Sequence, residues 1–145
     1  MESALLLEKA IALASGAHVG ITDRYEQPYI LHLVRVMQRV HTVDEKIIAM
    51  LHDIVEDTDW TLDMLKQEGF PGHIVTAVDY LTRRDEQTYE EYIQRLKTDP
   101  LAIKVKLSDL TDNMDIRRIP VLKAEDFDRL NKYLKAWHEL KDLLS

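Results

Sequence analysis

Cysteine is absent from this chain of 145 residues. Without it there is no thiolate nucleophile, no disulfide and no cysteine-based zinc site, so nothing points to an oxidising compartment and a cytoplasmic location is expected. No uncharged apolar stretch approaches the roughly 18 residues of a membrane span, and the acidic amino terminus is unlike a signal peptide. The net charge of −7 argues against binding duplex nucleic acid, which needs a broad basic face.

Strand-like alternation of apolar and polar residues is also lacking, whereas apolar residues recur at three- and four-residue spacing. We therefore expect an all-α fold, with residues 1–145 forming a single globular domain built as a bundle of about eight helices. Ser3 is expected to cap the first helix. The last helix is expected to bury an apolar stripe, or as a lesser alternative to use it in a homodimer, formed by Phe127, Leu130, Leu134 and Trp137.

The segment from Ile48 to Thr58 is largely apolar, yet it contains four ionisable residues: His52, Asp53, Glu56 and Asp57. Burying several such groups is costly unless partners or a metal ion compensate them, so the segment is not ordinary core. On one continuous helix, the two four-residue spacings would place an imidazole and three carboxylates along one edge. This pattern indicates metal ligands in His52 and Asp53, and a pair that handles protons in Glu56 and Asp57. The alternative for that pair is a solvated helix end.

Two further polar residues in apolar surroundings complete a possible ligand set. His32 lies between Leu31 and Leu33, and Asp109 lies within an apolar helical run. Two imidazoles and two carboxylates suit manganese, iron, zinc or magnesium, with one or two positions left for water or substrate. A bound ion would lower the pKa of water, which predicts hydrolase chemistry.

Candidate substrate contacts lie near the expected ion. Lys106 and Asn113 stand about one helical turn before and after Asp109, so both could face the same cavity. An ammonium and an amide there suit a phosphate-bearing substrate, although a salt bridge and a helix cap are the plainer alternatives. Arg24 is a further candidate for anion contact. His18 is expected to support the wall of the site through hydrogen bonds rather than to bind the ion.

The order H…HD…D, formed by His32, His52-Asp53 and Asp109, resembles the HD-domain metal-dependent phosphohydrolases. More narrowly, the chain between about Ala10 and Asn113 is similar to the hydrolase domain of the RelA/SpoT alarmone enzymes. Five ordered segments carry this resemblance: Ala17-His18-Val19-Gly20, Pro28-Tyr29-Ile30-Leu31-His32, Leu51 to Thr58, Leu81-Thr82-Arg83, and Val105 to Asp109.

The resemblance implies a manganese ion, or another divalent metal, held by His32, His52, Asp53 and Asp109. It implies that Glu56 and Asp57 position and deprotonate the attacking water. The implied reaction is that of a guanosine-3′,5′-bis(diphosphate) 3′-pyrophosphohydrolase, carried out by a small stand-alone relative. The expected partner is then a small nucleotide or phosphoester, and neither a nucleic acid nor a membrane.

Three positions depart from the family pattern. Asp23 stands where an arginine is expected against the nucleotide base, and Leu110 and Asp112 stand where an arginine and a histidine are expected. These departures keep two alternatives open. One is a phosphohydrolase that acts on a different nucleotide or phosphoester, and the other is a catalytically silent module that only binds a nucleotide.

Overall fold

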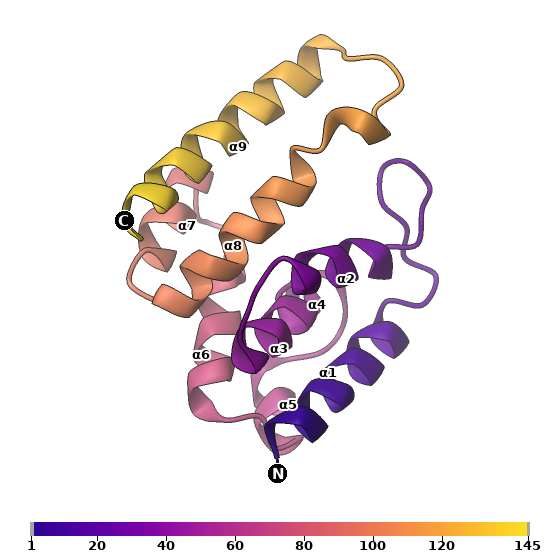
Figure 1. Cartoon of the computed structure of the whole chain (residues 1–145), viewed down its shortest axis with the longest axis vertical. Coiled ribbons are helices and arrows are strands. Elements are labelled where there is room, and N and C mark those ends of the chain that lie inside the picture. The colour runs from indigo at the N-terminus through magenta and orange to yellow at the C-terminus, as the bar shows by residue number, and fades with distance from the viewer. Residues whose placement is uncertain (1, 145) are drawn as a thin grey trace.

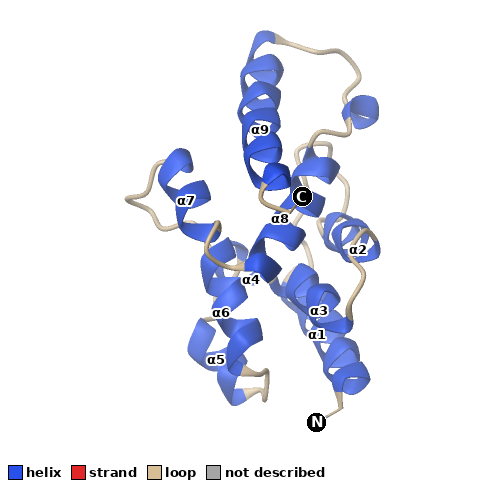
Figure 2. Cartoon of the chain, turned by 60° about the vertical axis from the view of Figure 1, so that its left-hand side comes forward, coloured by secondary structure: helices blue, strands red, loops and turns tan. Residues whose placement is uncertain are grey.

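The computed structural model describes residues 2–144, and helices supply its regular structure (Figures 1 and 2). In chain order they are α1 (Ser3–Ala17), α2 (Ile30–Gln38), α3 (Val43–Leu51), α4 (Ile54–Asp57), α5 (Leu62–Gln67), α6 (Gly72–Leu81), α7 (Tyr89–Leu96), α8 (Pro100–Asn113), the 3-10 helix η1 (Ile116–Arg118) and α9 (Ala124–Asp142). The strand-like pairing in the described part is an isolated bridge between Thr22 and Pro28. The all-α prediction is confirmed.

Helix α3 is the centre of the packing. Both α1 and α2 pack against it, and α8 contacts α2, α3 and α6, so residues far apart in the sequence meet around one core (Figure 1). Leu33 of α2, Leu51 of α3 and Leu110 of α8 are fully buried there. Helix α9 lies along α8. Among the described residues, no helix combines the length and apolar character needed to cross a membrane.

Short-range signals fix several helix ends. The Thr42 hydroxyl accepts a hydrogen bond from the backbone N–H of Glu45, which caps α3 as its spacing predicted. Thr88 and Glu91 form a reciprocal capping box at the start of α7. Asp99 caps α8, whose first residue is Pro100. Each of these signals lies within four residues of sequence, so it can be recognised without knowing the fold.

Two local expectations are wrong. Ser3 lies inside α1, and the preceding Glu2 makes no side-chain capping bond. The segment 48–58 is not one helix, because α3 ends at Leu51 and α4 begins at Ile54. Because of the turn between them, the side chains of His52, Asp53, Glu56 and Asp57 do not line one edge of a single helix, as was expected.

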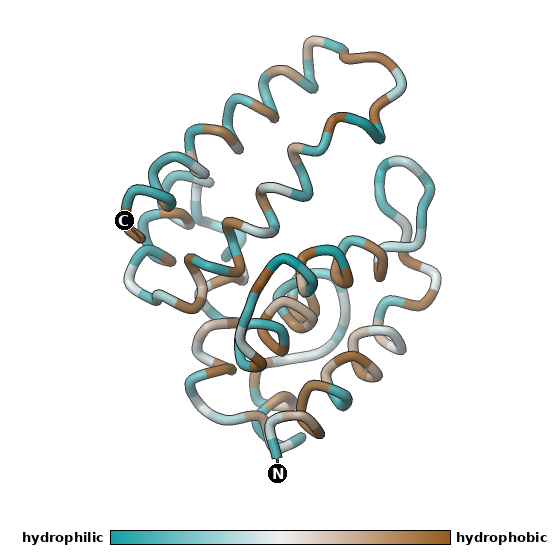
Figure 3. The backbone as a smooth tube through the Cα atoms, in the orientation of Figure 1, coloured by the Kyte–Doolittle hydropathy of each residue, from teal (hydrophilic) through white to brown (hydrophobic). Residues whose placement is uncertain are grey.

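The expected apolar face of α9 is only partly core. Phe127 is 52% exposed and Leu134 is 45% exposed, whereas Ala136 and Leu140 are buried. Because α9 contacts mainly α8, it buries a narrow stripe, and its other apolar residues remain on the surface. Figure 3 shows that apolar and polar residues alternate along this helix.

Candidate metal centre

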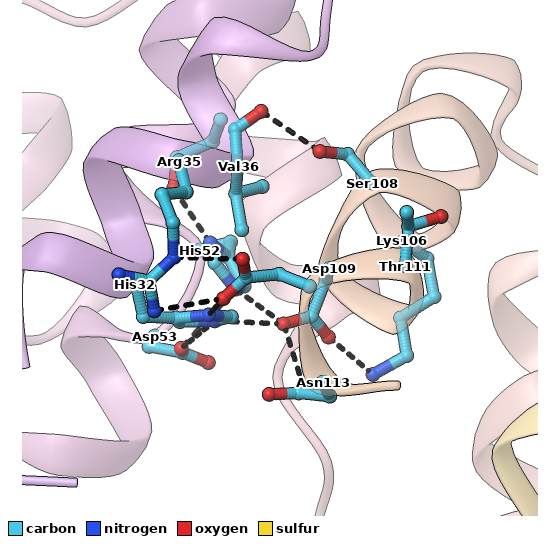
Figure 4. Close-up of polar contacts among 12 residues, drawn as sticks. His32, Arg35, Val36, His52, Asp53, Lys106, Ser108, Asp109, Thr111 and Asn113 are labelled. Carbon is cyan, nitrogen blue, oxygen red and sulfur yellow. Dashed lines mark hydrogen bonds and ion pairs between the residues drawn. The ribbon is translucent and has the colours of Figure 1, made fainter. Parts of the chain in front are cut away.

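Two imidazoles and two carboxylates from three separate parts of the chain meet beside α3. One ligand atom from each residue lies within 4.8 Å of all the others, and the four residues, called here the His/Asp cluster, are His32, His52, Asp53 and Asp109. His32 comes from α2, Asp109 comes from α8, and the other two form the turn between α3 and α4 (Figure 4). The cluster could hold a metal ion.

The carboxylates face the Nε2 atoms of both imidazole rings. Asp109 Oδ1 lies 2.9 Å from His32 Nε2 and 3.3 Å from His52 Nε2. Asp53 Oδ2 lies 3.1 Å from His52 Nε2 and 3.8 Å from His32 Nε2. The Tyr29 hydroxyl donates a hydrogen bond to the same Asp53 oxygen at 2.6 Å, which helps to fix that carboxylate.

The helix break explains how neighbouring residues both reach the cluster. On a continuous helix, adjacent side chains diverge by about 100°. Asp53 instead adopts φ −103° and ψ −1° between the two helices, and its side chain turns toward that of His52. The His52 ring is held by its Nδ1 atom, which donates to the carbonyl oxygen of Ala49 at 2.6 Å.

Both imidazoles are oriented through the nitrogen that points away from the cluster. His32 Nδ1 donates to Asp112 Oδ2 at 2.7 Å, as His52 Nδ1 does to Ala49. A proton on Nδ1 leaves a lone pair on Nε2 in the neutral ring, and here two such lone pairs would face carboxylates. This arrangement requires positive charge in the middle, supplied either by protons or by a cation. The donor set therefore fits a divalent metal ion.

The pKa values of the cluster residues also show that positive charge is favoured at this place. Burial opposes ionisation of Asp109, but Lys106 and the hydrogen bonds from both histidines outweigh it and hold its pKa well below the usual range. Burial likewise opposes ionisation of Asp53, and the charge of His52 lowers its pKa to about 2. Although burial alone would lower the pKa of His32, hydrogen bonds to Asp109 and Asp112 raise it to about 9.

Asp112, noted in the sequence only as a departure, is the partner that reasoning from motifs missed. It is fully buried and, besides His32, it accepts hydrogen bonds from Arg35 Nε at 2.8 Å and from Arg39 Nη1 at 2.9 Å. A signal was available, because Arg35 and Arg39 follow His32 by three and seven residues and so lie on one side of α2 and its C-terminal end. Two arginines on the same side as a buried histidine indicate that a carboxylate from another part of the chain lies beside them.

Glu56 and Asp57 lie on α4, directly after the cluster, and point to different partners. The Glu56 carboxylate accepts a hydrogen bond from the backbone N–H of Arg83, and burial raises its pKa. Asp57 Oδ2 lies 3.3 Å from His18 Nε2, while His18 Nδ1 donates to the carbonyl oxygen of Ala14. Neither carboxylate belongs to the four-residue cluster.

The candidate substrate contacts occupy two sides of Asp109. Arg24 and Asn113 line a cavity of about 320 Å³ that also exposes His32. Asn113 Nδ2 donates to Asp109 Oδ1 at 3.2 Å, and Lys106 Nζ donates to Asp109 Oδ2 at 2.9 Å from a buried position (Figure 4). The salt-bridge alternative for Lys106 is therefore realised in this structure.

The two remaining departures have structural roles. Asp23 Oδ1 accepts hydrogen bonds from the backbone N–H groups of Tyr25 and Gln27, so it shapes the loop that borders the cavity. Leu110 is fully buried in the core. An arginine at position 110 would need its charge compensated there, which explains why the apolar residue fits this chain.

Comparison with known proteins gives a consistent group of relatives. The chain is 30% identical over 135 residues to the guanosine-3′,5′-bis(diphosphate) 3′-pyrophosphohydrolase of Haemophilus influenzae, covering 83% of this chain and 20% of that protein. It is 31% identical over 124 residues to the bifunctional (p)ppGpp synthase/hydrolase SpoT of Escherichia coli, covering 74% and 17%. A probable GTP pyrophosphokinase of Mycobacterium leprae is 29% identical over 125 residues, covering 78% and 16%.

These values mean that the chain spans about a fifth or less of the curated relatives it matches. No family model matches the chain. Among solved structures, a metazoan ortholog of SpoT, described as hydrolysing ppGpp, aligns with a TM-score of 0.77 at 21% identity, covering 93% of this chain and 84% of that one. The fold is shared, and the resemblance to RelA/SpoT-type proteins is confirmed.

Proposed function

We propose that this chain, a relative of one segment of the RelA/SpoT-type proteins, is a metal-dependent phosphohydrolase that removes the 3′-pyrophosphate from guanosine tetraphosphate. Some of its curated relatives are named for synthesis and others for hydrolysis. The observation that favours hydrolysis is the His/Asp cluster, formed by His32, His52, Asp53 and Asp109. Its buried set of two nitrogens and two oxygens suits a metal ion that activates water.

In this proposal the His/Asp cluster binds one divalent ion, and manganese is the metal we assign. When bound, such an ion lowers the pKa of water and polarises a phosphoryl oxygen. His32 and His52 provide Nε2 atoms whose direction is fixed by the bonds at Nδ1. Tyr29 holds the carboxylate of Asp53 in place. The chain thus supplies a ligand set that needs little rearrangement.

We assign the proton transfer to Glu56 and the orientation of the attacking water to Asp57. The pKa of Glu56 is raised by burial, which brings a carboxylate closer to the range of an efficient general base near neutral pH. The backbone N–H of Arg83 fixes one Glu56 oxygen, and His18 fixes one oxygen of Asp57. Each carboxylate keeps its other oxygen for water.

Substrate binding is assigned to Arg24, Lys106 and Asn113. Arg24 and Asn113 border the cavity next to His32, which has room for part of a nucleotide. Lys106 adds a buried positive charge on the other side of Asp109. We also propose that residues 1–145 form one domain and that the exposed Phe127 and Leu134 make a homodimer surface.

A second candidate keeps the metal centre and changes the substrate to another nucleotide or phosphoester. The observation that favours it is Asp23, which binds two backbone N–H groups of its own loop at the mouth of the cavity. That loop therefore presents an acidic residue where an arginine is expected against the base.

The test is release of pyrophosphate from guanosine tetraphosphate by the purified protein with manganese, beside a panel of other nucleotides. Asp53→Ala is expected to lose both bound metal and turnover. Asp63→Ala, which changes an exposed carboxylate of α5, is the control and should retain both. Turnover of another nucleotide alone supports the second candidate. Saturable binding without any product would show a silent binding module and overturn both enzyme assignments.

A further inference from the structure

Three cations surround one tyrosine ring next to the His/Asp cluster. The Nζ atom of Lys132 lies 4.6 Å from the centre of the Tyr89 ring, the Nζ atom of Lys106 lies 5.8 Å from it, and Cζ of Arg83 also lies 5.8 Å from it. The three come from α9, from α8 and from the connection that follows α6. We call Arg83, Lys106 and Lys132 around Tyr89 the cation cluster.

The charges of this cluster are not balanced from within the described residues. Lys106 has a carboxylate partner, Asp109, at 2.9 Å. Within the described part of the chain, the Arg83 guanidinium donates to the carbonyl oxygen of Gln87 and pairs with no carboxylate, and Lys132 makes ring contacts but no ion pair. Burial lowers the pKa of Lys132, and the neighbouring charges, Arg83 first, lower it further. In a chain of net charge −7, such a gathering of like charges points to an anionic ligand.

The hydroxyl of Tyr89 adds an unused hydrogen-bond donor at the same place. It is buried and has no hydrogen-bond partner among residues 2–144, whereas the neighbouring Tyr92 donates to the carbonyl oxygen of Leu81 at 2.8 Å. A buried hydroxyl without a partner is costly, and it is found where a ligand or water completes the bond. Two cations without carboxylate partners and one free donor together suit a phosphate group.

Lys106 joins the cation cluster to the metal centre. Its ammonium contacts Oδ2 of Asp109, whose Oδ1 faces the Nε2 atoms of His32 and His52 (Figure 4). A ligand that spans one aspartate side chain therefore reaches from the metal centre to Lys106 of the cation cluster. A diphosphate has this form, with two phosphate groups joined by a single oxygen.

We propose that the cation cluster and the Tyr89 hydroxyl bind the outer phosphate of a diphosphate group whose inner phosphate lies at the metal centre. This inference rests on the proposed function and extends it, because it names the residues that recognise the outer phosphate of the leaving group. A substrate with a single phosphate at the same position would leave Lys132 and Arg83 without a partner. The protein should consequently prefer diphosphate esters to monophosphate esters.

The test compares binding of inorganic pyrophosphate and orthophosphate to the manganese-loaded protein by calorimetry, with free metal removed. Lys132→Met keeps the apolar stem, removes the charge and is expected to weaken pyrophosphate binding about tenfold, with little effect on orthophosphate. Lys141→Met removes an equal charge from an exposed position of the same helix and should change neither. Tyr89→Phe should weaken pyrophosphate binding several-fold without lowering the unfolding midpoint, because the hydroxyl lacks a partner.

Kinetics with guanosine tetraphosphate separate this inference from the proposed function. If no nucleotide is cleaved but Lys132→Met still loses pyrophosphate binding, the hydrolase assignment fails and the diphosphate site stands. If turnover is present while Lys132→Met leaves KM and pyrophosphate affinity unchanged, the hydrolase stands and the diphosphate site is wrong. Equal affinity of the unaltered protein for pyrophosphate and orthophosphate would also overturn the site.

Discussion

At the scale of single residues, Asp112 controls the direction of His32. Burial opposes its ionisation, yet hydrogen bonds from His32, Arg35 and Arg39 hold its pKa far below the ordinary value, so it is a carboxylate near neutral pH. A carboxylate behind a ligating imidazole fixes the ring and increases the basicity of Nε2. The position that departs from the family pattern thus orients a residue of the His/Asp cluster.

Asp112→Asn is expected to lower the affinity for manganese about 10- to 100-fold, the usual cost of losing such a partner. The amide keeps the size of the side chain but offers His32 Nδ1 a weaker acceptor and leaves Arg35 and Arg39 without a negative charge. Calorimetric titration of manganese measures the change, with Asp128→Asn on the exposed face of α9 as the control. Equal affinity in both variants would contradict the role of Asp112.

The same scale shows what the sequence could reveal about the site. His32 and Asp109 were recognisable because each is a polar residue within an apolar run, and the structure brings them together with His52 and Asp53. Comparison with the family motif marks Asp112 only as a departure and does not indicate which residue it contacts. Its partner His32 lies 80 residues away in sequence, so only the folded chain reveals their contact.

At the scale of elements, the sequence predicts helix ends where the determining contacts are local. The caps at Thr88 and Asp99 are of this kind. The break between α3 and α4 is not, because His52 and Asp53 are held in place by His32 and Asp109 from other helices. Helix periodicity could therefore find the segment but not the turn that makes it a site.

Helix α9 gives a prediction with an internal control. Leu140 is fully buried and Leu134 is 45% exposed, although both are leucines of the same helix. Leu140→Ala should cost about 2–5 kcal/mol of the free energy of unfolding, because it removes buried methyl groups and leaves a cavity. Leu134→Ala should cost about 0.5 kcal/mol or less. Urea unfolding measures both, and equal losses would mean that α9 buries its whole stripe.

At the scale of the whole molecule, the His/Asp cluster ties together segments that local structure leaves independent. His32 and Asp109 are 77 residues apart, and their contact joins α2 to α8 across the turn that follows α3. The cluster also concentrates carboxylates in a protein whose net charge is already −7. A divalent cation should therefore stabilise the entire fold rather than one loop, since it relieves repulsion at the point where three segments meet.

Manganese is accordingly expected to raise the free energy of unfolding by about 2.7 kcal/mol at a free concentration one hundred times its dissociation constant, and a chelator should remove the gain. Asp109→Ala deletes a carboxylate that contacts both histidines, so the unfolding midpoint of this variant should no longer respond to the metal. Asp63→Ala should respond like the unaltered protein. If Asp109→Ala gains the same stabilisation, manganese binds elsewhere, because an ion held by the His/Asp cluster cannot keep its full affinity after losing the ligand that α8 provides.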